Sequence, residues 1–434
     1  MQVAVAIDKA GYEVVFAGGC VRDALLGRDC QDYDLATNAQ PEQVEFVCDQ
    51  AGLRTRMVGA HFGVVLAMIG DEPIEIATFR EDGSYADGRH PDNVYYTNAK
   101  EDAKRRDFTI NGLFANPFTL EVTDYVGGLV DLEQGVIRAI GDPSDRFKED
   151  GLRLLRAVRF AVQLGFKIEE QTKLSMMQQI GGLQKVSAER MQAEFSKILM
   201  SDHPHRGVRM LADLGFLNYF FSEVLELKGC EQPAEFHPEG DVFEHTMLML
   251  DLIRPDFSLE LRLAILLHDI GKPKTQSYNE EKQRFTFYGH DTVGAQMAEA
   301  MLRSLKYPND IIDSVVVMVK YHMQFINVQR MRVSTLRRFI ARDTFAQEME
   351  LHRVDCLSSN GNIENYEFLQ RYIEEQNHEI QLPEPLLRGH DLLELGLEPG
   401  VKIGQILMEV QTKQLEQELY DYEQALNYVK LHYL

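Results

Sequence analysis

Cysteine is scarce in this sequence and never occurs in a paired spacing. The five cysteines are odd in number and scattered, and no two of them stand in a Cys-x-x-Cys arrangement. Small secreted domains depend on regular, even-numbered cysteine frameworks. A disulfide-stapled extracellular protein is therefore disfavoured, and we expect reduced thiols in a reducing cytosol.

The sequence also has no long apolar run and no basic leader. No stretch approaches the roughly 20 apolar residues that span a bilayer. Residues 1–4 lack the charged start and the cleavage pattern of a secretory signal. We therefore expect a cytoplasmic protein with no membrane partner. Nothing in the sequence indicates an oligomeric state.

Positive charge is in deficit. The sequence has 45 Lys and Arg against 68 Asp and Glu, which gives a net charge of −23. This charge opposes a general attraction to nucleic acid, so any RNA binding must rely on a local basic patch. The length of 434 residues is enough for roughly two to four domains with a substantial core.

The first motif is a glycine pair with an arginine, Gly18, Gly19 and Arg22, followed by two acids, Asp32 and Asp34. Glycines let backbone N–H groups approach an anion closely, and an arginine can bind phosphate through two bonds. Two aspartates that are two residues apart on a strand point to one face, where they repel unless a cation lies between them. Hard oxygen ligands together with substrate phosphates suit Mg²⁺.

A plain turn followed by a solvated, aspartate-rich loop would look similar if either feature stood alone. Their compact order favours a site for a nucleoside triphosphate and two Mg²⁺ ions. Short apolar runs alternate with turns up to about residue 139, which indicates a mixed α/β head domain whose sheet carries the carboxylates. Glu75 lies on one predicted strand, where it faces either the aspartate pair or solvent.

Residues 79–91 are polar and punctuated by glycine. Such a segment predicts a mobile loop, and loops of this length in compact domains are often functional lids. The alternative is a plain long connection. The candidate functional residues of the loop are Arg80, Asp82, Tyr85, Asp87 and Arg89.

A charged segment follows the loop, with Arg105 and Arg106 adjacent and with Asp107 and Asn111 close behind. The two guanidinium groups are phosphate donors, and the aspartate and the amide are able to hold a ribose. A charged helix start would look similar. The segment therefore supports a nucleotide site without establishing one.

Residues 146–160 have leucine and valine at helical spacing with charged residues beside them. Asp150 and Arg153 either form a salt bridge on a solvated helix or read a base. Cytosine and adenine present an amino donor beside an unprotonated ring nitrogen, whereas uracil and guanine present a carbonyl beside an N–H. An aspartate that accepts from the amino group and an arginine that donates to the ring nitrogen would therefore select C and A.

In this order, the motifs resemble those of the class II tRNA nucleotidyltransferases, the CCA-adding enzymes of the DNA polymerase β superfamily. The resemblance is close over the first half of the chain. It implies that Asp32 and Asp34 hold the catalytic metals and that Asp150 and Arg153 read the incoming base. The other residues that it assigns to nucleotide binding are Gly18, Gly19, Arg22, Arg105, Arg106, Asp107, Asn111, Arg156 and Arg159.

Bacterial poly(A) polymerases share the head motifs and are the nearest alternative. They carry a basic segment where this chain has residues 59–63, and usually a basic tail, whereas the tail of this chain is acidic. The loop at residues 80–91 resembles the one that CCA-adding enzymes use to change from C to A addition, which favours addition of both. Addition of A alone and poly(A) synthesis stay as alternatives, as does an RNA-repair hydrolase whose head only positions the substrate.

The second half of the chain carries a His-Asp-Ile-Gly-Lys run at residues 268–272. Adjacent His and Asp after an apolar helical run supply nitrogen and oxygen ligands to a divalent metal, whereas isolated histidines on such helices are more often core residues. The run resembles the HD phosphohydrolase superfamily, which implies phosphatase or 2′,3′-cyclic phosphodiesterase activity with a divalent metal of unspecified identity. The implied ligands are His245, His268, Asp269 and Asp355.

These observations predict an α+β protein in four parts. A mixed α/β nucleotidyltransferase head with a small sheet spans residues 1–139, and an all-helical neck that binds the base and tRNA spans 140–230. An all-helical HD domain spans 231–360, and a helical tail, a candidate tRNA-binding region, spans 361–434. The expected reaction is template-independent addition of C and A to tRNA that lacks part or all of its 3′ CCA, from CTP and ATP, with release of pyrophosphate.

Overall fold

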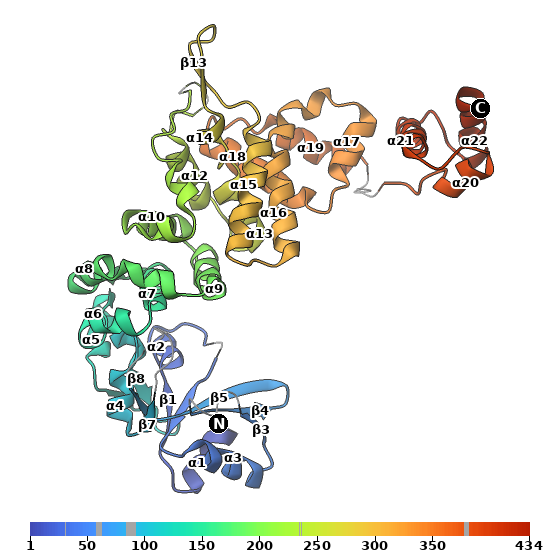
Figure 1. Ribbon diagram of the computed structural model, residues 1–434. Helices are drawn as coiled ribbons and strands as arrows, with labels where there is room; N and C mark the ends of the chain where they lie inside the picture. The colour runs from blue at the N-terminus through green and yellow to red at the C-terminus, as the bar shows by residue number, and fades with distance from the viewer. Residues whose placement is uncertain (31, 58–62, 84–92, 234, 236, 377–381) are drawn as a thin grey trace. The chain divides into compact units, whose positions relative to one another are not determined.

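The computed structural model describes residues 1–434 except 31, 58–62, 84–92, 234, 236 and 377–381 (Figure 1). The chain divides into two compact units. One comprises residues 1–225 and 301–307, and the other comprises residues 226–300 and 308–434. The finer four-part division inferred from the sequence stays a prediction.

The first unit is built on a seven-stranded sheet, counted over the described residues, in the order β3-β4-β5-β2-β1-β8-β9. Neighbouring strands are antiparallel, except that β2 and β5 are parallel with Leu35 opposite Ile76. The sheet is formed by β1 (Val14–Ala17), β2 (Leu35–Thr37), β3 (Arg54–Met57), β4 (Val64–Ile69), β5 (Glu72–Thr78), β8 (Leu113–Ala115) and β9 (Val122–Asp124).

Two helices, α1 (Gln2–Lys9) and α3 (Pro41–Gln50), cover one face of this sheet (Figure 1). Ile7 and Val44 from the helices pack with Ile76 from the sheet in one buried cluster. A capping box and Pro41 in the first turn start α3, and a proline at the first helical position is a start signal that the sequence itself carries. The remaining elements before the neck are α2 (Gly19–Leu25), the pair β6 (Arg80–Asp82) and β7 (Val94–Tyr96), α4 (Ala99–Lys104), the 3₁₀ helix η2 (Thr109–Asn111), α5 (Gly128–Gln134) and β10 (Val136–Ile137).

Helix α7 (Leu152–Leu164) organises the helical part of the first unit. Its predicted stripe of Leu152, Leu155 and Val158 is buried, and the helix packs against α9 (Ala188–Leu199) and α10 (Pro204–Asp213). Burial of this apolar face is what holds the helix in place. The other elements here are α6 (Pro143–Glu149), β11 (Lys167–Ile168), α8 (Glu170–Gln178), η3 (Ile180–Lys185), η4 (Phe216–Tyr219) and α11 (Ser222–Leu225).

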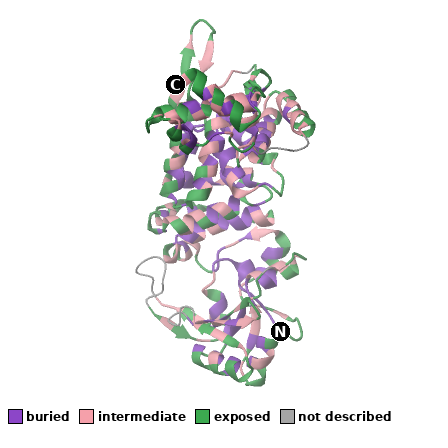
Figure 2. Ribbon diagram, turned by 90° about the vertical axis from the view of Figure 1, so that its right-hand side faces the viewer, coloured by how far each residue is buried: buried purple, intermediate pink, exposed green. Residues whose placement is uncertain are grey.

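The second unit is helical around α13 (Leu259–Leu267). Every residue of α13 from 261 to 267 is buried, as expected for a helix surrounded by others. It packs against α12 (Val242–Asp251), α16 (Asn309–Tyr321) and α18 (Phe345–Ser358), and Figure 2 shows the buried residues concentrated in the interior of these helices. The other elements are α14 (Lys272–Thr275), β12 (Ser277–Asn279), β13 (Arg284–Thr286), α15 (His290–Ser304), η5 (His322–Arg330), α17 (Val333–Ile340), α19 (Glu364–Glu375), α20 (Gly389–Glu394), α21 (Val401–Leu415) and α22 (Tyr422–Tyr433).

The predicted α+β class is confirmed, with two local differences. Asp32 and Asp34 precede β2 and do not lie in a strand. Arg80 and Asp82, predicted to begin a loop, form β6 instead, because they pair with each other at 2.9 Å and β6 joins β7. None of the helices in the described ranges combines the length and the apolarity needed to cross a bilayer.

Gly207 allows α10 to approach its neighbours closely. A Cβ atom at this position would stand 2.3 Å from Cγ2 of the buried Ile198, whereas a Cβ at Gly404, inside α21, would meet nothing within 4 Å. We expect Gly207→Ala to lower the free energy of unfolding by about 1–3 kcal/mol through overpacking. Gly404→Ala, the matched control, should raise it by up to about 1 kcal/mol because alanine favours helix. Urea denaturation of both variants checks this, and equal stabilisation by the two would contradict it.

Candidate functional site

The glycine turn at the end of β1 requires glycine for two reasons. Gly18 has a φ of 74°, in the left-handed region. A Cβ atom there would stand 2.7 Å from Nη1 of Arg106, so only glycine lets this guanidinium approach the turn. The Gly18 N–H donates to the Leu113 carbonyl at 3.0 Å, which ties the turn to β8.

A buried chain of hydrogen bonds connects α2, η2 and α7. Arg22 Nη1 donates to Asn111 Oδ1 at 2.6 Å, and Asn111 Nδ2 donates to Asp107 Oδ1 at 3.0 Å. Arg156 Nε donates to the other carboxylate oxygen of Asp107 at 2.7 Å. Burial alone would raise the pKa of Asp107, but the charge of Arg156 and the bond from Asn111 outweigh it and lower the pKa to about 2. Four residues that the sequence nominates are therefore held together.

Three guanidinium groups surround one aromatic ring in the same region. The central carbons of Arg22, Arg156 and Arg159 lie 5.0, 5.2 and 4.3 Å from the centroid of Phe160. Arg159 also pairs with Glu194 at 3.1 Å, and burial lowers its pKa to about 10. Cation–π contacts of this kind hold like charges close together. The three groups form a local basic patch, in which Asp23, Asp107 and Glu194 pair with the arginines.

Asp34 lies within the electrostatic influence of two other carboxylates, those of Asp32 and Glu75. Burial, followed by the charges of Glu75 and Asp32, raises the pKa of Asp34 to about 6. Glu75 on β5 therefore acts on the aspartate pair, although its own side chain is exposed. Acids that resist ionisation together are stabilised by a cation, and oxygen donors suit Mg²⁺. The residues present fit a magnesium site.

Arg105 and Arg106 are anchored to a single buried carboxylate. They pair with the two oxygens of Asp102 at 2.8 and 3.0 Å. Arg105 also lies 3.6 Å from Asp82, which fixes the start of the predicted loop to α4. The other candidate loop residues, Tyr85, Asp87 and Arg89, lie outside the described residues.

Asp150 and Arg153 are close in sequence but do not pair with each other. Asp150 ends α6, before α7 begins, and accepts two hydrogen bonds from Arg190 at 2.7 and 3.1 Å. Arg153 Nη1 donates to Glu149 at 2.5 Å. The expected alternative of a salt bridge between the two is therefore not formed. Arg190 was missing from the predicted site residues, since a partner 40 positions away leaves no local signal.

The four predicted HD residues come together inside the second unit. Nε2 of His245 lies 3.1 Å from Asp355 Oδ1, and Nε2 of His268 lies 3.1 Å from Asp269 Oδ2. Burial would lower the pKa of His245, but its bonds to Asp355 and Glu239 raise the pKa to about 9. Glu239 accepts from Nδ1 of His245 at 2.6 Å, so the other ring nitrogen faces the cluster.

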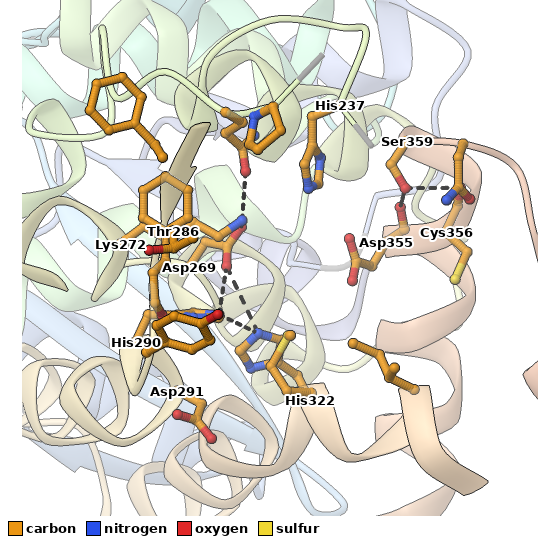
Figure 3. Close-up of a pocket in the computed structure, with 18 of the residues that line it drawn as sticks. His237, Asp269, Lys272, Thr286, His290, Asp291, His322, Asp355, Cys356 and Ser359 are labelled. Atoms are coloured by element: carbon orange, nitrogen blue, oxygen red, sulfur yellow. Dashed lines mark hydrogen bonds and ion pairs between the residues drawn. The ribbon is translucent and has the colours of Figure 1, made fainter. Parts of the chain in front are cut away.

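His290 and His322 join this cluster and were not among the predicted ligands. Their Nε2 atoms lie 3.2 Å apart, and they lie 3.4 and 3.8 Å from Asp269 Oδ1. Figure 3 shows the side chains of Asp269, His290 and His322 converging at the base of one pocket. Both histidines are visible in the sequence, but spacing alone does not separate them from ordinary core histidines.

Backbone carbonyls determine which nitrogen of these histidines faces the cluster. Nδ1 of His268, His290 and His322 lies 2.9, 2.7 and 2.6 Å from the carbonyl three residues earlier. A carbonyl only accepts, so each Nδ1 carries a proton and each Nε2 is the ring nitrogen directed at the cluster. Burial, followed by the charge of His268, lowers the pKa of His322 to about 4, which keeps it neutral.

Asp269 is shared by two groups of potential ligands. One group adds His245 and His268, and the other adds His290 and His322, with the ligand atoms of each group within 4.8 Å of one another. All five side chains are buried. Lone pairs of imidazole directed at a carboxylate fit divalent cations. Each of the two groups offers three donor atoms to a cation.

Three family models match the chain. The poly A polymerase head domain matches residues 14–138, the probable RNA and SrmB-binding site of polymerase A matches residues 165–227, and the HD domain matches residues 241–356. Both the head and the HD families generally use divalent metals. These matches confirm the resemblance found in the motifs.

Two curated relatives extend the similarity. The CCA-adding enzyme of Streptococcus suis (strain 05ZYH33) is 31% identical over 425 residues, which span 97% of this chain and 93% of that protein. The CCA-adding enzyme of Lactiplantibacillus plantarum is 44% identical over 214 residues, 49% of this chain and 51% of that protein. The second match therefore spans about half the length of the relative, whereas the first spans nearly all of it.

Solved structures share the fold. A Bacillus stearothermophilus CCA-adding enzyme in complex with CTP has a TM-score of 0.76 and 24% identity, covering 99% of this chain and 96% of that one. A Thermotoga maritima CCA-adding enzyme complexed with tRNA_CCA has a TM-score of 0.59 and 21% identity, covering 99% and 93%. These structures share the fold, and the 31% identity to the Streptococcus suis enzyme, over 97% of this chain and 93% of that protein, shows that the chain belongs to the CCA-adding enzymes, a family of nucleotidyltransferases.

Proposed function

We propose that this protein adds C and A to the 3′ end of tRNA from CTP and ATP and releases pyrophosphate. The observation that carries this proposal is the hydrogen-bond chain from Arg22 through Asn111 and Asp107 to Arg156, beside the carboxylates of Asp32 and Asp34. It joins a phosphate-binding turn, a polar ribose site and a metal site. Relatives solved with CTP and with tRNA_CCA support the same substrates.

Asp32 and Asp34 are the proposed ligands of two Mg²⁺ ions. Magnesium bound there activates the 3′ hydroxyl of the primer and neutralises charge on the leaving pyrophosphate. Glu75 adds negative charge beside Asp34, which strengthens the attraction for a cation. The pKa of Asp34, about 6, leaves this carboxyl mostly ionised at neutral pH.

The nucleotide triphosphate is proposed to lie along the basic patch. The backbone at Gly18 and Gly19 approaches the phosphates, and the guanidinium groups around Phe160 face them. Asp107 and Asn111 hold the sugar through polar groups that the surrounding arginines orient. The full set of proposed phosphate-binding arginines is Arg22, Arg105, Arg106, Arg156 and Arg159.

Asp150 and Arg153 are the proposed readers of the base. In the structure their charges are balanced by Arg190 and Glu149, so neither is left as a buried, unpaired charge when no base is present. An incoming C or A would exchange with these partners. U and G place a carbonyl opposite Asp150 and an N–H opposite Arg153, and both contacts are repulsive.

The HD cluster supports a second activity, hydrolysis of a phosphate ester such as a 2′,3′-cyclic phosphate. His245, His268, Asp269 and Asp355, together with His290 and His322, are the proposed ligands of a divalent metal. Such a metal lowers the pKa of a bound water so that it can attack phosphate at neutral pH. We further place the protein in the cytoplasm, where its five free cysteines stay reduced.

Replacing Asp34 separates the two activities. We expect Asp34→Ala to reduce incorporation of C and A into tRNA lacking CCA by at least about 1,000-fold, because the metal site loses its most buried ligand. His268→Ala should leave incorporation within about threefold and abolish metal-dependent hydrolysis of 2′,3′-cyclic nucleotides. Gel analysis of labelled tRNA measures the first reaction, and chromatographic separation of the 2′- or 3′-monophosphate product measures the second.

The matched control is Asp145→Ala, because the side chain of Asp145 is 65% exposed and pairs only loosely with Lys148 at 3.5 Å. It should leave both activities unchanged. Incorporation that survives Asp34→Ala but is lost in His268→Ala would overturn the assignment and make the HD cluster the working centre.

Base choice is tested by removing the two proposed readers. We expect the Asp150→Ala, Arg153→Ala double variant to lose about 10- to 100-fold of the preference for CTP over UTP, the worth of one or two specific hydrogen-bonded pairs. Single-nucleotide incorporation on tRNA ending before CCA gives kcat/KM for each nucleotide.

Arg190→Ala is the control for this test, since it breaks the same ion pair but leaves Asp150 in place. It should keep the preference for CTP. If the double variant and Arg190→Ala prefer CTP over UTP to the same extent, other residues read the base.

A further inference from the structure

A two-stranded hairpin, β12–β13, is inserted between ligands of the HD cluster. It follows His268 and Asp269 after the short helix α14, and it leads directly into His290 at the start of α15. Ser277 pairs with Thr286, Tyr278 with Phe285 and Asn279 with Arg284. The hairpin projects from the helices in Figures 1 and 2, and none of its residues from 277 to 286 is buried.

An isolated hairpin of this length gains little stability from its own contacts. Its two ends, however, are fixed to buried metal-ligating groups. Gly271 lies just before α14, which leads to the hairpin. A Cβ atom at this position would stand 2.3 Å from the His290 carbonyl oxygen, so the backbone here packs closely against the start of α15. The base of the hairpin is therefore rigid relative to the cluster, and its outer part is accessible.

Basic and acidic side chains occupy different positions on the hairpin. Lys282 and Arg284 line a cavity of about 710 Å³ that has Asp269, His290 and His322 among its walls. Glu280 and Glu281, in the turn, do not line it. Arg284 pairs with Glu235 at 3.3 Å, and Lys282 Nζ donates to the Tyr288 hydroxyl at 3.0 Å. The hairpin thus brings basic groups to a cavity that Asp291, Asp355 and Glu364 also line.

Aromatic rings lie among these cations. Tyr288 is 72% exposed at the rim. Phe285 and Phe287 line the same wall, and Tyr278 meets Phe285 edge to face at 5.5 Å. Aromatic rings between basic side chains are how proteins bind single-stranded nucleic acid, because bases stack on the rings while the cations follow the phosphates.

The cavity is too large for a phosphate group alone. Its volume lies within the range of about 300–1,000 Å³ that is typical of pockets for much larger ligands. Opposite the hairpin it is lined by the amide side chains of Asn360, Asn362 and Asn365, which can donate to and accept from base edges or ribose hydroxyls.

We propose that residues 277–288 form a binding arm for the 3′ end of a single-stranded RNA, and that the arm presents a terminal phosphate to the Asp269 cluster. This inference rests on the hydrolase part of the proposed function and names its substrate class. For a 2′,3′-cyclic end, one water is added: a P–O bond to water oxygen forms, one P–O bond to ribose breaks, and the water proton passes to the released hydroxyl. No oxidant or other reactant is required.

The test compares substrates that differ in length. The full chain is loaded in turn with Mg²⁺, Mn²⁺, Co²⁺ and Ni²⁺. Hydrolysis is measured on a pentanucleotide ending in a 2′,3′-cyclic phosphate and on bis(p-nitrophenyl) phosphate, and binding of the labelled pentanucleotide is measured by anisotropy. The variants are Lys282→Ala with Arg284→Ala, and Tyr288→Ala. Glu280→Ala with Glu281→Ala is the matched control on the same hairpin.

We expect the Lys282→Ala, Arg284→Ala variant to lower kcat/KM for the pentanucleotide and to weaken its binding by about 10- to 100-fold, mainly through KM. Tyr288→Ala should lower both by about tenfold, the worth of one stacked base. The small ester should be hydrolysed within about twofold of the unmodified protein by every variant, and the control should not weaken the pentanucleotide.

If all variants had equal kcat/KM for the pentanucleotide and bound it equally well, the proposed binding arm would be contradicted. Loss of small-ester hydrolysis along with the pentanucleotide would also overturn it, because the residues would then support the cluster itself. If no substrate is hydrolysed with any metal, the hydrolase part of the proposed function fails. Binding that still depends on Lys282, Arg284 and Tyr288 would then support the arm on its own.

Discussion

The buried carboxylate of Asp107 is the contact on which the first unit depends. A charge in this position is tolerated only while Arg156 and Asn111 remain bonded to it. Since Asn111 also binds Arg22, the requirement to satisfy one carboxylate fixes the head turn, the 3₁₀ helix η2 and α7 relative to one another. The proposed phosphate, ribose and base sites therefore share one rigid frame.

In the second unit, histidines are the buried polar groups that are held by hydrogen bonds. His268, His290 and His322 each direct Nδ1 to a carbonyl three residues earlier in their own segment. Local backbone geometry thus decides which nitrogen is protonated, and packing of separate helices brings the free nitrogens to Asp269. Buried imidazoles around one carboxylate supply the nitrogen and oxygen donors that suit a divalent metal.

Electrostatics explain how an acidic chain can have substrates that are themselves negatively charged. The net charge opposes RNA, so we place the attraction at the guanidinium groups around Phe160 and at the cavity wall that bears Lys282 and Arg284. Arg156 and Arg159 pair with Asp107 and Glu194, and Arg284 pairs with Glu235. Such pairing keeps the arginines oriented and limits binding to the places where catalysis is proposed.

The sequence by itself determined what depends on neighbours along the chain. The glycine turn, the paired aspartates, the start of α3 and the His-Asp run were recognisable because backbone conformation and ligand type are encoded within a few residues. The tertiary structure alone decided the pairing of Asp150 with Arg190, the placement of Arg80 and Asp82 in a strand, and the inclusion of His290 and His322 in the HD cluster. Those outcomes depend on which side chains, distant in sequence, come into contact when helices and strands bury their apolar faces. The spacing of residues along the chain does not predict such contacts.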